Sequence, residues 1–504
     1  MQRKSPALSS RLRYLSAYLQ QAHSLHVHSL QAHFLPALLW VALVVVNSVG
    51  MAQAQSPEDN SLVRGNPQDI VGGLFRDRFS VPPSQLHPLN ATDLYANQVL
   101  DRIYEQLTQV DVETLKFLPV LAQSWEVSAD KKTFTFHLNP LARWQDGRPV
   151  TAEDVAFSFE VMFHEKLRTR GKWQAYYSNF ERVEVLDPQT VRFFAKIDHF
   201  RNFVNIGSLR VLPRHGFPDT DPNETPLAKA PMGSGPYRFE RWDRASAVRL
   251  ARAENYWGRD LPQNRGRNNF QLWMTKIIQT DKVALESLKK GELDLLTFTP
   301  EQWTLEATGA GFAESPGSPD HPLKPGQIVK LDVLNQAPRS YRYVGWNLES
   351  PLFEDKRVRW AMSHLFDRDT FIEKFYYGLD EKAVGPFAAN SPYASPKVRP
   401  VPFSVAEALR LLREAGWRDS DGDRVLDKAG RPLRFTILTA DPEVSVKVLT
   451  LTKETMRRAG VDLRIQVVDW STLLELIDEY RFDAVMLGWS RTSWPDPTAL
   501  WHSK

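Results

Sequence analysis

The stretch from Leu121 to Phe159 constrains the fold more than any other part of the chain, because its patterns specify several elements in a fixed order. Apolar and polar residues alternate in Ser124–Val127 and again in Thr133–Leu138, as they do in strands with one buried face. Turn-forming residues separate the two segments, which predicts a β-hairpin. We expect the large apolar side chains of this stretch to build a core: Trp125, Phe134, Phe136 and Trp144.

A helix is predicted directly after this hairpin. Asp146-Gly147 marks a tight turn. Thr151 and Asp154 follow with the spacing of a capping box, although the acid is an aspartate rather than the usual glutamate or glutamine. Apolar residues then recur at helical spacing from Val155 onward. The order of hairpin, turn and capped helix predicts mixed α/β structure but names no function.

The composition is that of a globular protein with more than one domain. A chain of 504 residues is too long for one ordinary hydrophobic core and predicts two or three domains. Its apolar content of 42% is typical of soluble globular proteins. There is no cysteine. This excludes disulfides, thiolate catalysis, cysteine-based zinc sites and the lipid-modified cysteine of bacterial lipoproteins.

Residues 1–54 have the features of a cleavable export signal. Basic residues come first, an apolar run follows at Phe34–Val46, and small residues precede a cleavage position after Ala54. An uncleaved membrane anchor is the alternative, but the apolar run is shorter than the roughly 20 residues that a spanning helix needs. Four histidines suggest a metal site, yet they lie in the segment that we expect to be removed: His23, His26, His28 and His33.

The net charge gives no reason to expect a nucleic acid or an anionic membrane as a partner. The formal value is +3 for the whole chain. Residues 1–54 contain four basic residues and no acidic one, so the rest of the chain has one more acidic than basic residue. A nearly neutral protein lacks the field that attracts polyanions.

The Leu121–Phe159 stretch resembles the signature of the family 5 extracellular solute-binding proteins, the peptide- and nickel-type periplasmic components of ABC importers. The matching residues are Leu121-Ala122, Ser124-Trp125, Phe136-His137-Leu138, Trp144, Asp146-Gly147 and Thr151-Ala152-Glu153-Asp154-Val155. Other family landmarks follow the same order along the chain: Tyr104-Glu105-Gln106-Leu107, Met232-Gly233-Ser234-Gly235-Pro236-Tyr237, Asn255-Tyr256-Trp257 and Phe353–Arg359.

The resemblance implies a two-lobed α/β periplasmic binding protein of type II, cluster C-like, with an extra small domain inserted in the first lobe. The expected divisions are a signal peptide at 1–54, the first lobe at 66–110 and 226–325, the small inserted lobe at 111–225, and the second lobe at 330–504. Family members continue past the position of Lys504 and return to the first lobe, so we expect the chain to be truncated.

The function implied is capture of peptides or modified peptides in an interlobe cleft and delivery to the membrane subunits of an ABC permease. We expect a monomer in the periplasm, without a cofactor and without nucleic acid. Receptors for a nickel chelate, haem or an oligosaccharide, and a sensor that presents its ligand, are the alternatives. Enzyme activity is not expected, since the chain has no G-x-S-x-G, H-E-x-x-H or phosphate-loop motif.

The resemblance places the ligand site around the end of the apolar strand Phe482–Trp489. Tryptophans there offer apolar area and one N–H donor, and strand-end backbone groups can pair with an extended peptide. Trp470 and Trp494 could instead be core residues, and Tyr176 is expected in the cleft from the small lobe. The expected ligand-binding residues are Trp470, Gly488, Trp489, Ser490, Ser493, Trp494 and Tyr176.

The chain departs from the family pattern at the charged groups of the cleft. Ser493 stands where peptide-binding members have an aspartate that anchors the amino terminus of the ligand. Met486 and Ile477 stand where oligopeptide-binding members have arginines. A free peptide held by salt bridges at this site is therefore not expected, whereas a modified peptide or another oligomeric solute stays open.

Three other patterns suggest chemistry that we do not expect. Gly233-Ser234-Gly235 lacks the spacing of a nucleophile elbow and predicts a turn. Arg357 and Arg359 could bind an anion but more simply fix a helix start by pairing with Asp355 and Asp367. Aspartates at 419, 421, 423 and 427 suggest calcium, but counting from Asp419 the positions for glycine and glutamate of an EF-hand hold Arg424 and Gly430. The Asp-Gly turns are therefore predicted to close a hairpin onto Arg434–Leu438.

Overall fold

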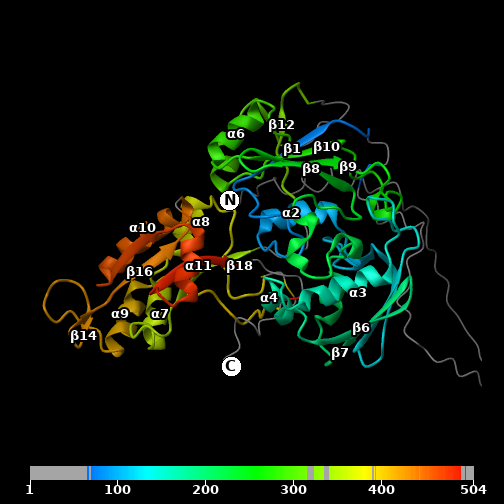
Figure 1. Ribbon diagram of the computed structural model, residues 1–504. Helices are drawn as coiled ribbons and strands as arrows, with labels where there is room; N and C mark the ends of the chain where they lie inside the picture. The colour runs from blue at the N-terminus through cyan, green and yellow to red at the C-terminus, as the bar shows by residue number, and fades with distance from the viewer. Residues whose placement is uncertain are drawn as a thin grey trace, which may run out of the picture. The chain divides into compact units, whose positions relative to one another are not determined.

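The computed structural model describes residues 65–66, 70–314, 323–333, 340–388, 391, 393–441, 443–489 and 494 (Figure 1). The proposed signal segment and the residues on either side of Trp494, including Ser490 and Ser493, lie outside these ranges. Within them, no helix is both long and apolar enough to cross a membrane. Strands and helices are mixed throughout, which agrees with the predicted α/β class.

The first sheet has four strands in the order β1-β10-β9-β8, so its first strand pairs with one that comes some 200 residues later. Their bounds are β1 Leu74–Phe79, β10 Leu272–Ile277, β9 Ala247–Arg252 and β8 Tyr237–Asp243. Helices α2 (Leu94–Ile103) and α6 (Asp281–Lys289) lie on opposite faces (Figure 1). Arg78 of β1 binds Asp281 at 2.6 Å and so fixes α6 to its face.

The second sheet contains the predicted hairpin and is entirely antiparallel, in the order β4-β5-β7-β6. Its strands are β4 Ala122–Val127, β5 Thr133–Leu138, β7 Thr190–Ala195 and β6 Phe180–Asp187. Helix α3 (Ala152–Glu160) covers it. Shorter elements flank the sheet: β2 Thr108–Val110, β3 Phe117–Pro119, α4 Arg170–Tyr176 and α5 Asn202–Gly207.

The capping box at α3 explains why an aspartate suits this position. Asp154 Oδ2 accepts hydrogen bonds from the backbone N–H of Thr151 at 3.0 Å and from the indole of Trp144 at 3.2 Å. Its other oxygen accepts from the backbone N–H of Arg214 at 2.9 Å. The buried carboxylate therefore joins the turn, the helix start and a distant loop, which is a structural task.

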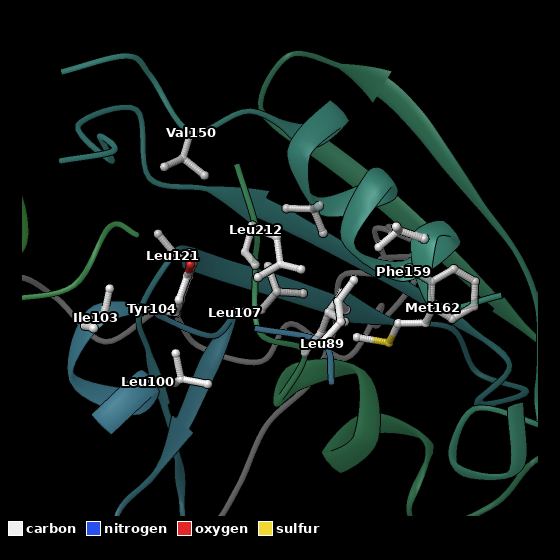
Figure 2. Close-up of a cluster of buried hydrophobic side chains, with 14 of the residues drawn as sticks. Leu89, Leu100, Ile103, Tyr104, Leu107, Leu121, Val150, Phe159, Met162 and Leu212 are labelled. Carbon is white, nitrogen blue, oxygen red and sulfur yellow. The ribbon is translucent and has the colours of Figure 1, made fainter. Parts of the chain in front are cut away.

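One continuous apolar core joins the first and second sheets. Figure 2 shows side chains from α2, among them Leu100 and Ile103, in the same cluster as Phe159 and Met162 from the end of α3 and the turn that follows. The predicted core residues of the opening stretch are confirmed: Phe134, Phe136 and Trp144 are buried and Trp125 packs against them.

The third sheet has its own core and comes from the C-terminal part of the chain. Its order is β13-β18-β16-β17, with bounds β13 Tyr341–Trp346, β18 Ala484–Trp489, β16 Arg434–Thr439 and β17 Asp462–Val467. One face packs on a helical layer: α7 Lys356–His364, α8 Arg368–Phe375, α9 Val405–Glu414 and α10 Val444–Arg458. Helix α11 (Trp470–Asp478) covers the other face through Leu473, which packs with Leu438 and Val485.

Small elements complete the described chain. Two-stranded sheets form from β11 Phe312–Ala313 with β12 Ile328–Val329, and from β14 Asp427–Lys428 with β15 Arg431–Pro432. The hairpin predicted to close onto Arg434–Leu438 is wrong: the hairpin is formed by β14 and β15, and Arg434–Thr439 is strand β16, which pairs with β17 and β18. The predicted pairing of Arg357 with Asp355 is confirmed, at 2.7 Å. Asp367 does not pair with these arginines as expected; it caps α8 by accepting from the backbone N–H of Thr370.

Candidate functional site

Three parallel strands of the third sheet end at one edge. β16 runs parallel to both β17 and β18, so Thr439, Val467 and Trp489 mark the same carboxyl-terminal edge. Helices α10 and α11 begin just beyond β16 and β17 (Figure 1). The carboxyl ends of parallel strands are where ligands of α/β proteins usually bind. Two of the expected site residues, Trp470 and Trp489, are at this edge.

Strand β18 extends beyond its neighbour on one side. β13 pairs with all six residues of β18, from Ala484 to Trp489. β16 pairs only with Ala484 and Val485. Among the described strands, none therefore pairs with Met486–Trp489 on the β16 side. We call this side of Met486–Trp489 the open edge of β18.

The tryptophan at the end of the open edge stands beside a tyrosine of β13. The indole of Trp489 is 41% exposed. Its ring and that of Tyr343 are nearly parallel, at 3°, with centroids 6.3 Å apart. Tyr341 is a further aromatic residue of this group, 6.1 Å from Tyr343. Sequence reasoning identified Trp489 but not the tyrosines.

Trp470 is the first residue of α11 and does not fit the core alternative, since its side chain is 58% exposed. Asp469 precedes it as the N-cap and accepts from the backbone N–H of Thr472 at 3.0 Å. The cap fixes the start of the helix, and hence the tryptophan, at the carboxyl edge of the sheet.

Trp494 stacks on Phe117 of β3, with ring centroids 5.1 Å apart and 13° between the ring planes. Phe117 in turn meets Phe203 edge to face at 4.6 Å, and Phe203 packs against the core of the second sheet. Tyr176, at the end of α4, is 38% exposed and contacts Tyr177 edge to face at 4.9 Å. In the described part of the chain, the rings of Trp494 and Tyr176 form no aromatic pair with Trp470 or Trp489.

The charged side chains at the carboxyl-terminal edge of the third sheet pair with groups of the chain itself. Asp441, just after β16, accepts from the backbone N–H groups of Glu443, Val444 and Ser445 at the start of α10. It also binds Arg342 of β13 at 3.3 Å. With Asp469 at the start of α11, both helix N-termini here are occupied by carboxylates of the chain, which weighs against an anionic ligand at either helix.

Asp380 is the further acid near Arg342. Burial raises the pKa of its carboxyl, and the positive charge of Arg342 opposes that rise. Arg342 also lies over the ring of Tyr376, 5.6 Å from its centroid. The guanidinium thus pairs with Asp441 and lies over the ring of Tyr376, on the face of β13 opposite to Tyr343.

Two other places that could hold a ligand do not include the expected residues. A groove of about 500 Å³ lies between the β8–β9 hairpin and α6 on the first sheet, and its charges are paired, as in Lys276 with Glu292 at 3.8 Å. Asp419, Asp421 and Asp423 are exposed and have oxygens within 4.8 Å of one another. Asp419 accepts from the backbone N–H of Gly422 and Arg424, as expected in a turn.

Comparison with known proteins identifies the class of protein to which the chain belongs. Residues 116–504 match the family model of bacterial extracellular solute-binding proteins, family 5 Middle. The oligopeptide-binding protein AppA of Bacillus subtilis is 27% identical over 486 residues, which cover 93% of this chain and 83% of AppA.

Comparison with solved structures identifies the fold. The structure of Bacillus subtilis AppA in complex with a nonapeptide has a TM-score of 0.70 and 25% identity, over 86% of this chain and 82% of AppA. NikA from Brucella suis in complex with Fe(III)-EDTA has a TM-score of 0.68 and 21% identity, over 85% and 80% of the two chains. The fold is that of the two-lobed α/β periplasmic binding proteins. Within that class, the chain belongs to the family 5 extracellular solute-binding proteins.

Proposed function

We propose that this protein captures a peptide or modified peptide along the open edge of β18 and delivers it to an ABC permease. The observation that carries the proposal is the open edge of β18, where none of the described strands pairs with Met486–Trp489 on the β16 side. Backbone N–H and C=O groups on such an edge can pair with an extended main chain, as in strand addition. Pairing of this kind binds peptides with little regard to side-chain identity.

The exposed aromatic residues supply the second part of the interaction. Trp489 and Trp470 offer apolar area at the same edge, and each indole keeps one N–H donor. Gly488, between Leu487 and Trp489, presents no side chain to an approaching main chain. Ser490, Ser493, Trp494 and Tyr176 complete the proposed ligand-binding set, with the first two outside the described residues.

The proposed ligand is not held by charged groups of β18 or α11. Met486 packs against the core beneath α7–α10, and Ile477 packs on the opposite face with Leu473. The positions where the family resemblance implies arginines therefore belong to packing in this chain. This favours a peptide whose ends are modified or lie elsewhere, over one fixed by salt bridges at this strand.

The proposed division into lobes follows the cores. The first lobe is 66–110 with 226–325, the small inserted lobe is 111–225, and the second lobe is 330–504. The separate core of the third sheet supports the boundary of the second lobe, and the core shared by the first two sheets agrees with a small lobe that is inserted in the first. Closure of the lobes around the ligand is the usual motion of such proteins. We place the protein in the periplasm as a monomer, after cleavage of the signal at Ala54, without catalytic activity.

The test is native mass spectrometry of the protein purified from periplasm, followed by binding of a casein peptide digest. A ladder of short peptide masses supports the proposal, whereas one chelate, haem or sugar mass would replace the peptide by that solute. Trp489→Ala should weaken peptide binding about tenfold, since a buried aromatic contact contributes on the order of 1 kcal/mol or more. Trp360→Ala is the matched control, because Trp360 is similarly exposed but belongs to α7.

A further inference from the structure

We propose that Tyr343 is a positioning residue that holds the Trp489 indole in its ligand-binding orientation, and that Gly345 provides the space in which the Tyr343 ring lies. The inference rests on the proposed function, in which Trp489 contacts the ligand. It extends the site from the end of β18 to the neighbouring strand β13, and it assigns a task to two residues that do not themselves touch the ligand.

The strand register places the two rings on one face. β13 and β18 are antiparallel, with Tyr343 opposite Leu487 and Tyr341 opposite Trp489. Tyr343 and Trp489 are therefore diagonal neighbours two residues apart along the strand. Diagonal pairs on one face of an antiparallel ladder are within reach of each other when the side chains are aromatic.

The rings of Tyr343 and Trp489 form a parallel, stacked pair. Their planes differ by 3° and their centroids are 6.3 Å apart. Tyr343 is half-buried, while Trp489 is 41% exposed, so the tyrosine is the anchored member. Burial raises the pKa of the Tyr343 hydroxyl, and the neighbouring indole of Trp489 opposes the rise.

Gly345 explains why Tyr343 can take this position. Gly345 lies two residues further along β13 and on the same face. A Cβ atom at Gly345 would lie 3.3 Å from Cε2 of Tyr343 and 3.3 Å from Cγ2 of Val485. The tyrosine ring thus lies over the glycine, and a methyl group at this position would contact the ring too closely. Gly345 therefore leaves the space that the Tyr343 ring occupies.

The arrangement matters because Trp489 lies at the end of a strand that has no described partner on one side. A free indole at such an edge would sample several rotamers and would lose that freedom when a ligand binds. A parallel ring held beside the indole removes part of this cost in advance, which raises affinity without a new ligand contact.

The experiment compares four variants of the full chain, using as probe the synthetic form of the casein-digest peptide that the protein retains most strongly. Tyr343→Phe removes the hydroxyl and keeps the ring, and Gly345→Ala displaces the ring and keeps the hydroxyl. Tyr376→Phe is the control for the first, since Tyr376 lies near Arg342 on the opposite face. Gly311→Ala is the control for the second, since a Cβ there meets nothing within 4 Å.

Affinity is measured by calorimetry, and the position of Trp489 by ¹⁹F NMR of protein labelled with 5-fluorotryptophan. The Trp489 resonance is assigned by its loss in Trp489→Phe. We expect Tyr343→Phe to weaken binding about threefold, because it removes the polar group beside the indole, and Gly345→Ala to weaken it at least as much. Both should move the Trp489 resonance in the ligand-free protein, while the two controls leave affinity and resonance unchanged.

Two results would overturn the inference in distinguishable ways. If Trp489→Ala weakens binding but Tyr343→Phe and Gly345→Ala leave both affinity and resonance unchanged, Tyr343 does not position Trp489, and the proposed function stands. If Trp489→Ala itself leaves affinity unchanged, both the ligand contact and its positioning are wrong. Thermal unfolding of each variant shows whether a loss of affinity reflects a loss of fold.

Discussion

The second sheet and the carboxyl edge of the third sheet are both rich in aromatic residues, but they use them in opposite ways. Phe136 of the second sheet and Trp144 in the turn that follows it are 0% and 2% exposed. Trp489 and Trp470 at the edge of the third sheet are 41% and 58% exposed. The Leu121–Phe159 stretch, which carries the family resemblance, therefore serves to pack a core. The proposed ligand site instead lies at a sheet edge where the aromatic side chains are exposed.

The largest expected effect is on the packing side of this comparison. Phe136→Ala should lower the free energy of unfolding by about 3–5 kcal/mol, because it leaves a cavity among Phe193 and Phe203 in a close-packed core. Urea denaturation followed by circular dichroism measures this loss. Trp489→Ala should cost less than about 1 kcal/mol in the same assay, as expected of an exposed residue. If the two variants lost equal free energy of unfolding, the contrast between a packed sheet and an exposed sheet edge would be wrong.

A buried acid gives the next effect. Glu105 accepts hydrogen bonds from Tyr256 at 2.5 Å and from Trp257 at 2.8 Å, and burial raises its pKa to about 7 from 4.5. Because the pKa in the folded protein is the higher one, the protonated acid stabilises the fold below about pH 4.5. That contribution is lost as the pH rises through about 7.

Titration of Glu105 changes the free energy of unfolding by at most about 3 kcal/mol, at 1.36 kcal/mol per pKa unit. Thermal unfolding between pH 4.5 and 8 should show the native protein losing stability relative to Glu105→Gln, which cannot titrate at this position. A constant difference between the two across this range would mean that Glu105 keeps an ordinary pKa.

The capping carboxylate gives a smaller effect on the same side. Asp154→Asn keeps the size of the side chain but replaces an acceptor by an amide N–H that faces donors from Thr151, Trp144 and Arg214. We expect a loss of about 1–3 kcal/mol, as for other buried groups left without partners. Asp146→Asn, at an exposed turn nearby, is the control. A loss equal to that of the control would mean that the shared cap does not join the turn to the helix.

The sequence predicted the packed region well and the site only in part. Alternation and capping are local patterns, so the hairpin of β4 and β5 and the start of α3 followed directly from the residues. The sequence shows the aspartate in place of glutamate at 154, but its hydrogen bonds to Trp144 and Arg214 depend on loops that only the folded chain brings together.

The pairing of β13 with β18 could not be predicted, because about 140 residues separate the two strands. Without that register, Tyr343 is one aromatic residue of an alternating strand, and nothing links it to Trp489. The open edge of β18 has the same origin, since it depends on where β16 stops pairing. The Arg342–Asp441 pair likewise joins segments that are remote in the chain.

Hydrogen–deuterium exchange of the segment Ala484–Trp489, with and without the retained casein peptide, tests the central claim most directly. If an extended ligand pairs with the open edge, amides of Met486–Trp489 should exchange more slowly in the complex, while those of the β4–β5 hairpin stay unchanged. Unchanged exchange at Met486–Trp489 under saturating peptide, with protection at another part of the chain, would contradict the account and place the ligand there.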